Sequence, residues 1–258
     1  MKKVIVSLTS YPAAIHFVPK AVKSILNGTV LPDMVILYLT FSQFPNSEIP
    51  MELTEMAKEN PIFKIRDYKE DIRSYRKLYP AIIDFPEAII VTIDDDVAYH
   101  KNMLHKLLAA HEKYPNAIIA HRVKQIKMDS PYRKWRKYRW YHYFWKDLQP
   151  KYDNLQTGVG GVLYPPNSLK KEMLDTALFT EIAPTVDDIW FWAAAVANGV
   201  KLAPVRFGYS KPRGLGKPKA ESLKYINFKS GEDVNRTVFE KIINIFPIIK
   251  ERLEKKSI

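Results

Sequence analysis

Short apolar runs alternate along the first half of the chain with segments whose apolar residues recur at helical spacing. The runs rich in β-branched residues predict strands, over residues 4–10, 34–39, 62–68, 88–93 and 117–123. The segments between them predict helices, over residues 18–28, 52–60, 74–84 and 102–114. Strands that alternate with helices in this way predict an α/β fold with a doubly wound, mostly parallel sheet.

The pattern changes from about residue 124 onwards. Helices are still expected over residues 168–178 and after Asp188 as far as Gly199, and the segment 238–256 is amphipathic with an interruption at Pro247. The chain contains neither an internal repeat nor a linker rich in Gly, Ser or Pro. We therefore expect one domain over residues 1–258, with an elaborated second half.

Composition excludes several classes of protein. Hydrophobic residues make up 47% of the 258, enough for a sizeable core, and no cysteine is present. Disulfides and thiolate metal sites are therefore excluded, and a cytoplasmic location is expected. The longest apolar runs are too short to span a membrane. The formal net charge of +12 favours polyanionic partners, namely nucleic acid, phosphorylated substrates or an anionic membrane face.

Three consecutive carboxylates, Asp94–Asp96, follow the predicted strand 88–93. Ligands of doubly wound sheets bind at the carboxyl ends of strands, and a divalent cation would relieve the mutual repulsion of these acids. Mg²⁺ or Mn²⁺ suits oxygen ligands on such a turn. Alternate residues of an extended turn share a side, so Asp94 and Asp96 would share the ion while Asp95 faces elsewhere. The alternatives are a solvated acidic turn or a helix N-cap at Asp96.

A second acidic pair, Asp187–Asp188, opens the helix that ends at Gly199. Acids at a helix N-terminus are favoured by the helix dipole, so the pair can be purely structural, with Trp190 in the core. Alternatively, one acid is a general base that deprotonates an acceptor hydroxyl. The glycines of LQTGVGGVLYPP (155–166) either let the backbone approach a ligand closely or form a sharp turn before a strand.

Taken together, five segments resemble a glycosyltransferase of the GT-A type. They are SLTSYP (7–12), DIRSYRKLYP (71–80), IDDDVAY (93–99, similar to the DXD motif), GVGGVLYPP (158–166) and VDDIWF (186–191). The nearest likeness is to bacterial family-2-like enzymes that build capsular or lipopolysaccharide glycans. The resemblance implies that residues 1–123 bind a nucleotide-diphosphate sugar, with UDP favoured and GDP and dTDP open. Residues 124–258 would then form the acceptor and catalytic half, with a basic C-terminal helix.

The same resemblance assigns roles to individual residues. It implies that Asp96 binds Mn²⁺ or Mg²⁺, with Asp94 on the ribose or in the metal shell, and that Asp188 or Asp187 is the base of an inverting displacement; we favour Asp188. The residues implied for the donor nucleotide and its phosphates are Thr9, Tyr11, Asp71, Arg73, Lys77, Asp94 and Asp95. Those implied for the acceptor, a glycan or lipid-linked glycan, are Gly160, Gly161, Tyr164 and Trp190. Arg73 and Lys77 can equally be an exposed basic helix face.

Basic and aromatic residues are dense over residues 127–147. This segment fits a membrane interface, a sugar-stacking acceptor site, a single-stranded nucleic-acid site or a half-buried helix. Together with the segment 238–256, it suggests peripheral attachment to an anionic membrane. Two other functions compete. A nucleotidyltransferase acting on sugar phosphates would usually have a Gly-rich loop after the first strand, which is absent here. A nucleic-acid-binding protein would leave both acidic motifs unexplained.

Overall fold

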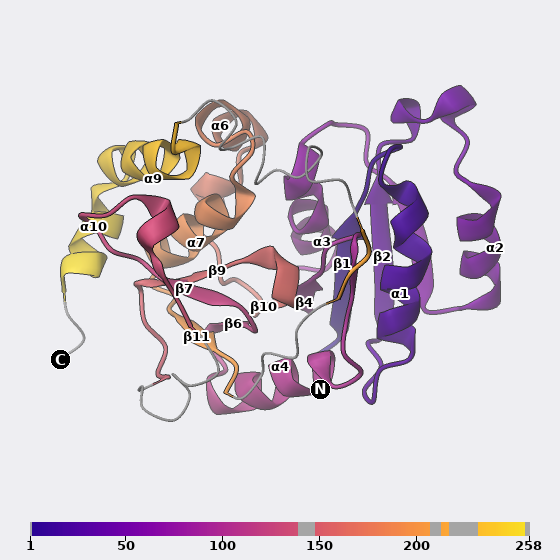
Figure 1. Ribbon diagram of the computed structural model, residues 1–258, viewed down its shortest axis with the longest axis horizontal. Helices are drawn as coiled ribbons and strands as arrows, with labels where there is room; N and C mark the ends of the chain where they lie inside the picture. The colour runs from indigo at the N-terminus through magenta and orange to yellow at the C-terminus, as the bar shows by residue number, and fades with distance from the viewer. Residues whose placement is uncertain (1, 139–147, 207–212, 217–231, 256–258) are drawn as a thin grey trace.

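A seven-stranded sheet forms the centre of the protein (Figure 1). The computed structural model describes residues 2–138, 148–206, 213–216 and 232–255. The strand order is β11-β6-β10-β4-β1-β2-β3, and β10 is antiparallel to both of its neighbours while the other pairs are parallel. The bounds are β1 Val4–Thr9, β2 Met34–Leu39, β3 Phe63–Asp67, β4 Ile89–Thr92, β6 Ile118–Ala120, β10 Val162–Tyr164 and β11 Leu202–Pro204. The predicted mostly parallel α/β sheet is confirmed.

Two small antiparallel sheets accompany the central one. The first pairs β5 (Val97–Ala98) with β12 (Arg213–Gly214), and the second has the order β8 (Arg136–Lys137), β7 (Val123–Gln125), β9 (Asn154–Gln156). The prediction of one strand over 117–123 was wrong, because the chain leaves the central sheet after β6 and enters the second small sheet at β7. His121 lies at this bend, with its Nε2 atom 3.0 Å from the Met103 carbonyl oxygen.

Helices cover both faces of the central sheet, because successive strand residues point to opposite faces. One face packs against α1 (Val18–Leu26), α2 (Met51–Glu59) and α4 (Met103–Lys113). The other packs against α3 (Tyr79–Asp84), α6 (Thr176–Ile182), α7 (Asp187–Ala197), α9 (Val234–Ile245) and α10 (Pro247–Glu254). In β1, for example, Val6 packs on the face covered by α1, α2 and α4, and Ile5 packs on the opposite face.

Several short 3₁₀ helices complete the described elements: η1 Ile15–Phe17, η2 Phe41–Gln43, η3 Pro45–Ser47, η4 Arg73–Lys77, η5 Tyr132–Lys134, η6 Gly158–Gly160 and η7 Lys171–Leu174. The predicted helix 74–84 is therefore η4 followed by α3. The predicted helix 168–178 was wrong in its bounds. The Asp175 side chain accepts hydrogen bonds from the amides of Ala177 and Leu178, so a new helix begins there.

Where it is described, the basic aromatic segment consists of a turn, the short 3₁₀ helix η5 and the strand β8, and contains no α-helix. Trp135 is 2% exposed, its indole N–H donates to the Ser130 carbonyl at 3.0 Å, and its ring meets Phe239 edge-on. Tyr138 is also buried, whereas Arg136 and Lys137 are exposed. The described part thus matches the core alternative, and residues 139–147 lie outside the described residues.

The C-terminal segment forms two helices, with the break at Pro247 as predicted. The apolar face of α9, including Phe239 and Ile242, lies in the core, which accounts for its amphipathic pattern. Among the described residues, no helix combines the length and the apolar character needed to cross a bilayer.

The order of the strands fixes where a ligand can bind. From β1 the chain adds β2 and β3 on one side and then returns to place β4 on the other. The carboxyl ends of β1 and β4 therefore flank the point where the strand order reverses, which is the usual ligand crevice of a doubly wound sheet. Asp94–Asp96 follow β4 at this edge.

Candidate active site

The acidic turn after β4 has one buried and two partly exposed carboxylates. Asp95 is 6% exposed and accepts a hydrogen bond from the Ser10 hydroxyl at 2.6 Å, which ties the turn to the end of β1. Asp94 and Asp96 are partly exposed, as alternate residues of an extended turn should be. The Asp94 amide donates to the Tyr99 hydroxyl at 2.8 Å. Asp94 and Asp96 are thus the two acids of the turn that a ligand can reach.

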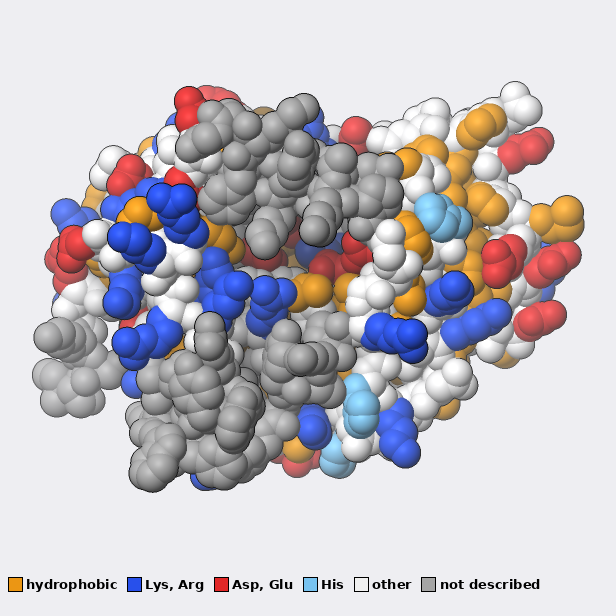
Figure 2. Space-filling view, in the orientation of Figure 1, with side chains coloured by type: hydrophobic (Ala, Val, Ile, Leu, Met, Phe, Trp, Pro, Cys, Tyr) orange, Lys and Arg blue, Asp and Glu red, His pale blue; other side chains and the backbone are white. Residues whose placement is uncertain are grey.

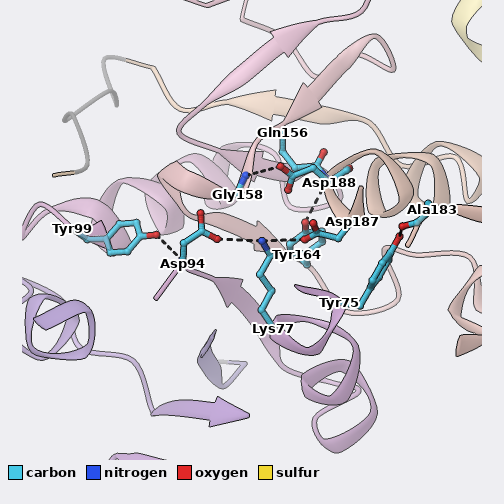
Figure 3. A network of polar contacts seen from close by, with 10 residues as sticks. All are labelled: Tyr75, Lys77, Asp94, Tyr99, Gln156, Gly158, Tyr164, Ala183, Asp187 and Asp188. Atoms are coloured by element: carbon cyan, nitrogen blue, oxygen red, sulfur yellow. Dashed lines mark hydrogen bonds and ion pairs between the residues drawn. The ribbon is translucent and has the colours of Figure 1, made fainter. Parts of the chain in front are cut away.

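Lys77, the last residue of η4, connects this turn to the start of α7 (Figure 3). Its ammonium lies 3.2 Å from Asp94 Oδ1 and 3.1 Å from Asp187 Oδ2. Both Lys77 and Asp187 are buried. The two acidic motifs, which are far apart in the sequence, therefore meet at a single lysine.

The carboxylate of Asp188 is held by the glycine-rich segment. The Gly158 amide donates to Asp188 Oδ2 at 3.1 Å, and the Gln156 side-chain amide donates to the Asp188 carbonyl at 3.0 Å. Asp188 is partly exposed, whereas its neighbour Asp187 is buried against Lys77. Of the two acids that open α7, Asp188 is therefore the one available to a bound molecule.

Position 158 requires a glycine because three charged side chains approach its backbone closely, and not because of its backbone conformation. A Cβ atom at this position would lie 2.8 Å from Lys77 Nζ, 3.2 Å from Asp94 Oδ1 and 3.4 Å from Asp188 Oδ1. Any side chain would therefore force the charged groups apart. Three elements that are distant in sequence converge on this glycine, which marks the centre of the candidate site.

The charges of this cluster perturb its acid–base behaviour. Burial, followed by the charge of Asp187, raises the pKa of Asp188 from 3.8 to about 7, against the opposing effects of Lys77 and the Gly158 amide. Burial alone would lower the pKa of Lys77, but the charges of Asp187, Asp94 and Asp188 raise it well above its ordinary value. Lys77 is therefore cationic at neutral pH, and Asp188 titrates near neutrality, where a general base is most effective.

Buried Arg76 organises the nucleotide side of the crevice. Its guanidinium donates to the Thr9 hydroxyl at 2.8 Å, to the Ser10 carbonyl at 3.0 Å and to the Thr40 hydroxyl. These contacts join the carboxyl ends of β1 and β2. The Thr9 hydroxyl also donates to the Tyr38 carbonyl at 2.8 Å, so it is engaged within the protein.

The remaining residues predicted for the donor lie on this same side. Tyr11 follows β1 and is partly exposed. Asp71 and Arg73 are exposed at the start of η4, where the Asp71 carboxylate accepts from the Arg73 amide at 3.1 Å. Arg73 has a φ of 52°, an uncommon conformation for a residue with a side chain. Arg73 can thus reach solvent from η4, whereas Lys77 is enclosed.

The four residues predicted for the acceptor are all buried. Tyr164 is 3% exposed, and Asp188 is among the charges that raise its pKa after burial, so it lies behind the site. Trp190 is 0% exposed and donates to the Met173 carbonyl at 2.8 Å, so its burial does not fit contact with an acceptor. Gly160 packs against His121, and Gly161 has a φ of +87°, as a turn requires.

The acidic turn fits one kind of metal site. Within the described ranges, no group of three or more His, Asp or Glu side chains could enclose an ion. Mg²⁺ and Mn²⁺ sites that serve phosphate substrates need only one or two carboxylates, with water and phosphate oxygens completing the shell. Asp94 and Asp96 meet this requirement. On the face of the molecule seen in Figure 2, acidic side chains lie near the middle, with Lys and Arg side chains beside them.

Comparison with known proteins adds a family match over part of the chain and a shared fold. Residues 84–177 match the profile of Glycosyl transferase family 2, a range that includes the acidic turn and the glycine segment. A mannosyltransferase from Pyrobaculum calidifontis, solved in complex with GDP-Man and Mn²⁺, superposes with a TM-score of 0.57 at 13% identity, over 98% of this chain and 69% of that one. Residues 84–177 are thus similar to glycosyl transferase family 2, and the chain shares its fold with the Pyrobaculum mannosyltransferase.

A second solved structure, S. aureus TarS 1–349, aligns at 13% identity and a TM-score of 0.49 over 80% of this chain. The chain described here spans only 58% of the length of that one. No curated protein matches its sequence. The family segment ends before α7, so it contains neither Asp187 nor Asp188.

The sequence did not single out three residues that organise the candidate site. Gly158 was part of a noted glycine segment, but its contact with Asp188 depends on how α7 packs. Arg76 lies between Arg73 and Lys77 in a basic stretch where nothing marks it as buried. Ser10 directly follows the first strand, and this position at a sheet edge was the available signal.

Proposed function

We propose that the enzyme transfers a sugar from a nucleotide-diphosphate sugar to a hydroxyl of a glycan or lipid-linked glycan, by a metal-dependent displacement with inversion. The observation that carries the proposal is the convergence of Asp94, Lys77, Gly158 and Asp188 at the carboxyl edge of the sheet. It brings a metal-binding type of turn next to an acid with a pKa near neutrality. A metal-dependent transfer of this class needs both.

The residues divide the chemistry as follows. Asp94 and Asp96 would hold Mn²⁺ or Mg²⁺, which when bound neutralises the charge that develops on the leaving diphosphate. Asp188 accepts the proton of the acceptor hydroxyl as its oxygen attacks the anomeric carbon. The bond between that carbon and the phosphate oxygen breaks, and the nucleoside diphosphate leaves. The Gly158 amide orients the Asp188 carboxylate for this step.

The donor nucleotide is proposed from likeness and not from pocket shape. The sequence motifs favour UDP, whereas the Pyrobaculum mannosyltransferase holds GDP-Man and Mn²⁺. Both nucleotides belong in the first assay. A role in bacterial surface polysaccharide synthesis is part of the same proposal and rests on the resemblance of the motifs.

Release of nucleoside diphosphate from UDP- and GDP-sugars, with water or added glycans as acceptor, tests the reaction. We expect release with one nucleotide, dependence on Mn²⁺ or Mg²⁺, and loss of release in Asp188→Asn and Asp96→Ala. Undiminished release in Asp188→Asn would remove Asp188 from the role of base. Release that persists in EDTA would remove the metal.

Peripheral membrane attachment is a further part of the proposal. It is supported by the net charge of +12 and by Ile245 and Ile248, which are 46% and 37% exposed at the junction of α9 and α10. Exposed Lys241 and Lys250 lie close to them in the sequence. Flotation with anionic vesicles at low salt should carry the protein upwards. Absence from the floating fraction would contradict attachment.

A further inference from the structure

Lys77 is surrounded by the protein's own charged groups. Its ammonium contacts Asp94 and Asp187, and the Gly158 backbone closes a third side, since a Cβ there would lie 2.8 Å from Nζ. The side chain is 11% exposed. An ammonium has three hydrogen-bond donors, and two already face carboxylates. Little of Lys77 is left for a substrate phosphate.

The two partners of Lys77 belong to opposite sides of the site. Asp94 follows β4, where the donor would bind, and Asp187 is the first residue of α7, which presents Asp188. Through its two ion pairs, the lysine links the acidic turn to the start of α7. Figure 3 shows it lying between the two carboxylates.

We propose that Lys77 is a positioning residue, which holds the donor-side carboxylate Asp94 and the helix of the base at one fixed separation, and is not a ligand of the donor diphosphate. This inference rests on the proposed function, because the separation matters only if Asp94 serves the donor and Asp188 the acceptor. Reactions of this kind lose rate steeply when reacting groups are displaced by even about 1 Å.

Replacing Lys77 by methionine separates the two roles. The side chain keeps a similar length and loses its charge. A positive charge would be removed from beside Asp94, so the attraction of that acid for a divalent cation should increase. The start of α7 would lose its tie to the acidic turn, so turnover should fall. A diphosphate ligand would behave in the opposite way, because its loss weakens nucleotide binding.

The experiment compares Lys77→Met with Lys23→Met, an exposed lysine on α1, as the matched control. Calorimetry gives the dissociation constants of Mn²⁺ alone and of UDP or GDP with Mn²⁺, and donor hydrolysis gives kcat and KM. For Lys77→Met we expect Mn²⁺ to bind as tightly or several-fold more tightly, nucleotide affinity within about threefold, and kcat at least about 30-fold lower. Nucleotide affinity reduced tenfold with kcat within threefold would overturn the inference and make Lys77 a phosphate ligand.

The double variant Lys77→Met/Asp187→Asn covers a failure to fold, because it removes the buried lysine and one buried acid together. In the Asp187→Asn background, the Lys77→Met change should reduce kcat much less than in the wild type, since the tie is already broken. An equal loss in both backgrounds would refute the tie. If the wild type itself releases no nucleoside diphosphate, the proposed function fails first. If it does, and Lys77→Met matches Lys23→Met, only this inference fails.

Discussion

Asp188→Asn should make the protein more stable while it abolishes the proposed transfer. The substitution keeps the size of the side chain and an oxygen that can accept from the Gly158 amide, which lies 3.1 Å from Asp188 Oδ2. It removes a charge that folding disfavours, because burial and Asp187 raise the pKa of Asp188 from 3.8 to about 7. An acid of this kind reduces the free energy of unfolding when it is ionised.

The magnitude follows from linkage. The gap between 3.8 and about 7 corresponds to about 4 kcal/mol for the ionised side chain in the folded state, at about 1.36 kcal/mol per pKa unit. Asp188 is partly exposed, so solvent screens part of this cost, and we expect about 2 kcal/mol. For a chain of this length that is a rise in Tm of about 4–8 °C.

The pH dependence has a defined sign. The folded state holds a proton on Asp188 that the unfolded state has lost between pH 3.8 and about 7, so stability contributed by this group falls as pH rises through that window. The advantage of Asp188→Asn should therefore be full at pH 8 and absent near pH 4. Denaturation at both pH values, with hydrolysis of the donor at pH 8, measures it. Equal stability of the two proteins at pH 8, or activity within tenfold of wild type, would refute the reasoning.

Three further predictions concern the same cluster. The ratio kcat/KM should rise with pH through a midpoint near 7, since Asp188 must be ionised to act as the base; a profile flat from pH 5 to 9 would contradict this. Gly158→Ala places a methyl group 2.8 Å from the Lys77 ammonium and should lower kcat for donor hydrolysis more than tenfold. Gly214→Ala, where a Cβ would have nothing within 4 Å, should leave kcat unchanged. Equal effects of the two substitutions would contradict the close packing proposed around Gly158. Ser10→Ala removes the 2.6 Å hydrogen bond to buried Asp95 and should reduce the free energy of unfolding by about 1–3 kcal/mol, measured in urea; no loss would show that the bond contributes little.

The central sheet was predictable because its strands are apolar runs, and because apolar residues recur at helical spacing in the segments between them. The prediction of one strand over 117–123 failed because this apolar run is divided between two sheets at His121. Pairing partners such as β10 lie far along the chain, and a local pattern does not encode them. The helix around 168–178 failed for a local reason, since Asp175 caps a separate helix.

The acidic motifs were predictable from their positions at a strand end and a helix start. Their meeting was not, because it depends on the packing of residues 77, 94, 158 and 187 from separate elements. Lys77 lies in a basic stretch that predicted phosphate contact, and only the fold shows that two carboxylates enclose it. The roles given to Asp94, Asp96 and Asp188 stay predictions.

Binding of nucleotides with and without metal is the decisive measurement for a nucleotide-sugar site at Asp94–Asp96. Calorimetry or thermal shift would compare UDP, GDP, CMP and dTDP and their common sugar conjugates, each with Mn²⁺ or with EDTA. A ligand that binds only the folded state at a hundredfold excess over its Kd raises stability by about 2.7 kcal/mol. We expect one nucleoside diphosphate to stand out, and its effect to disappear in EDTA and in Asp96→Ala. If no nucleotide binds or stabilises the protein in Mn²⁺, a nucleotide-sugar site at Asp94–Asp96 is contradicted.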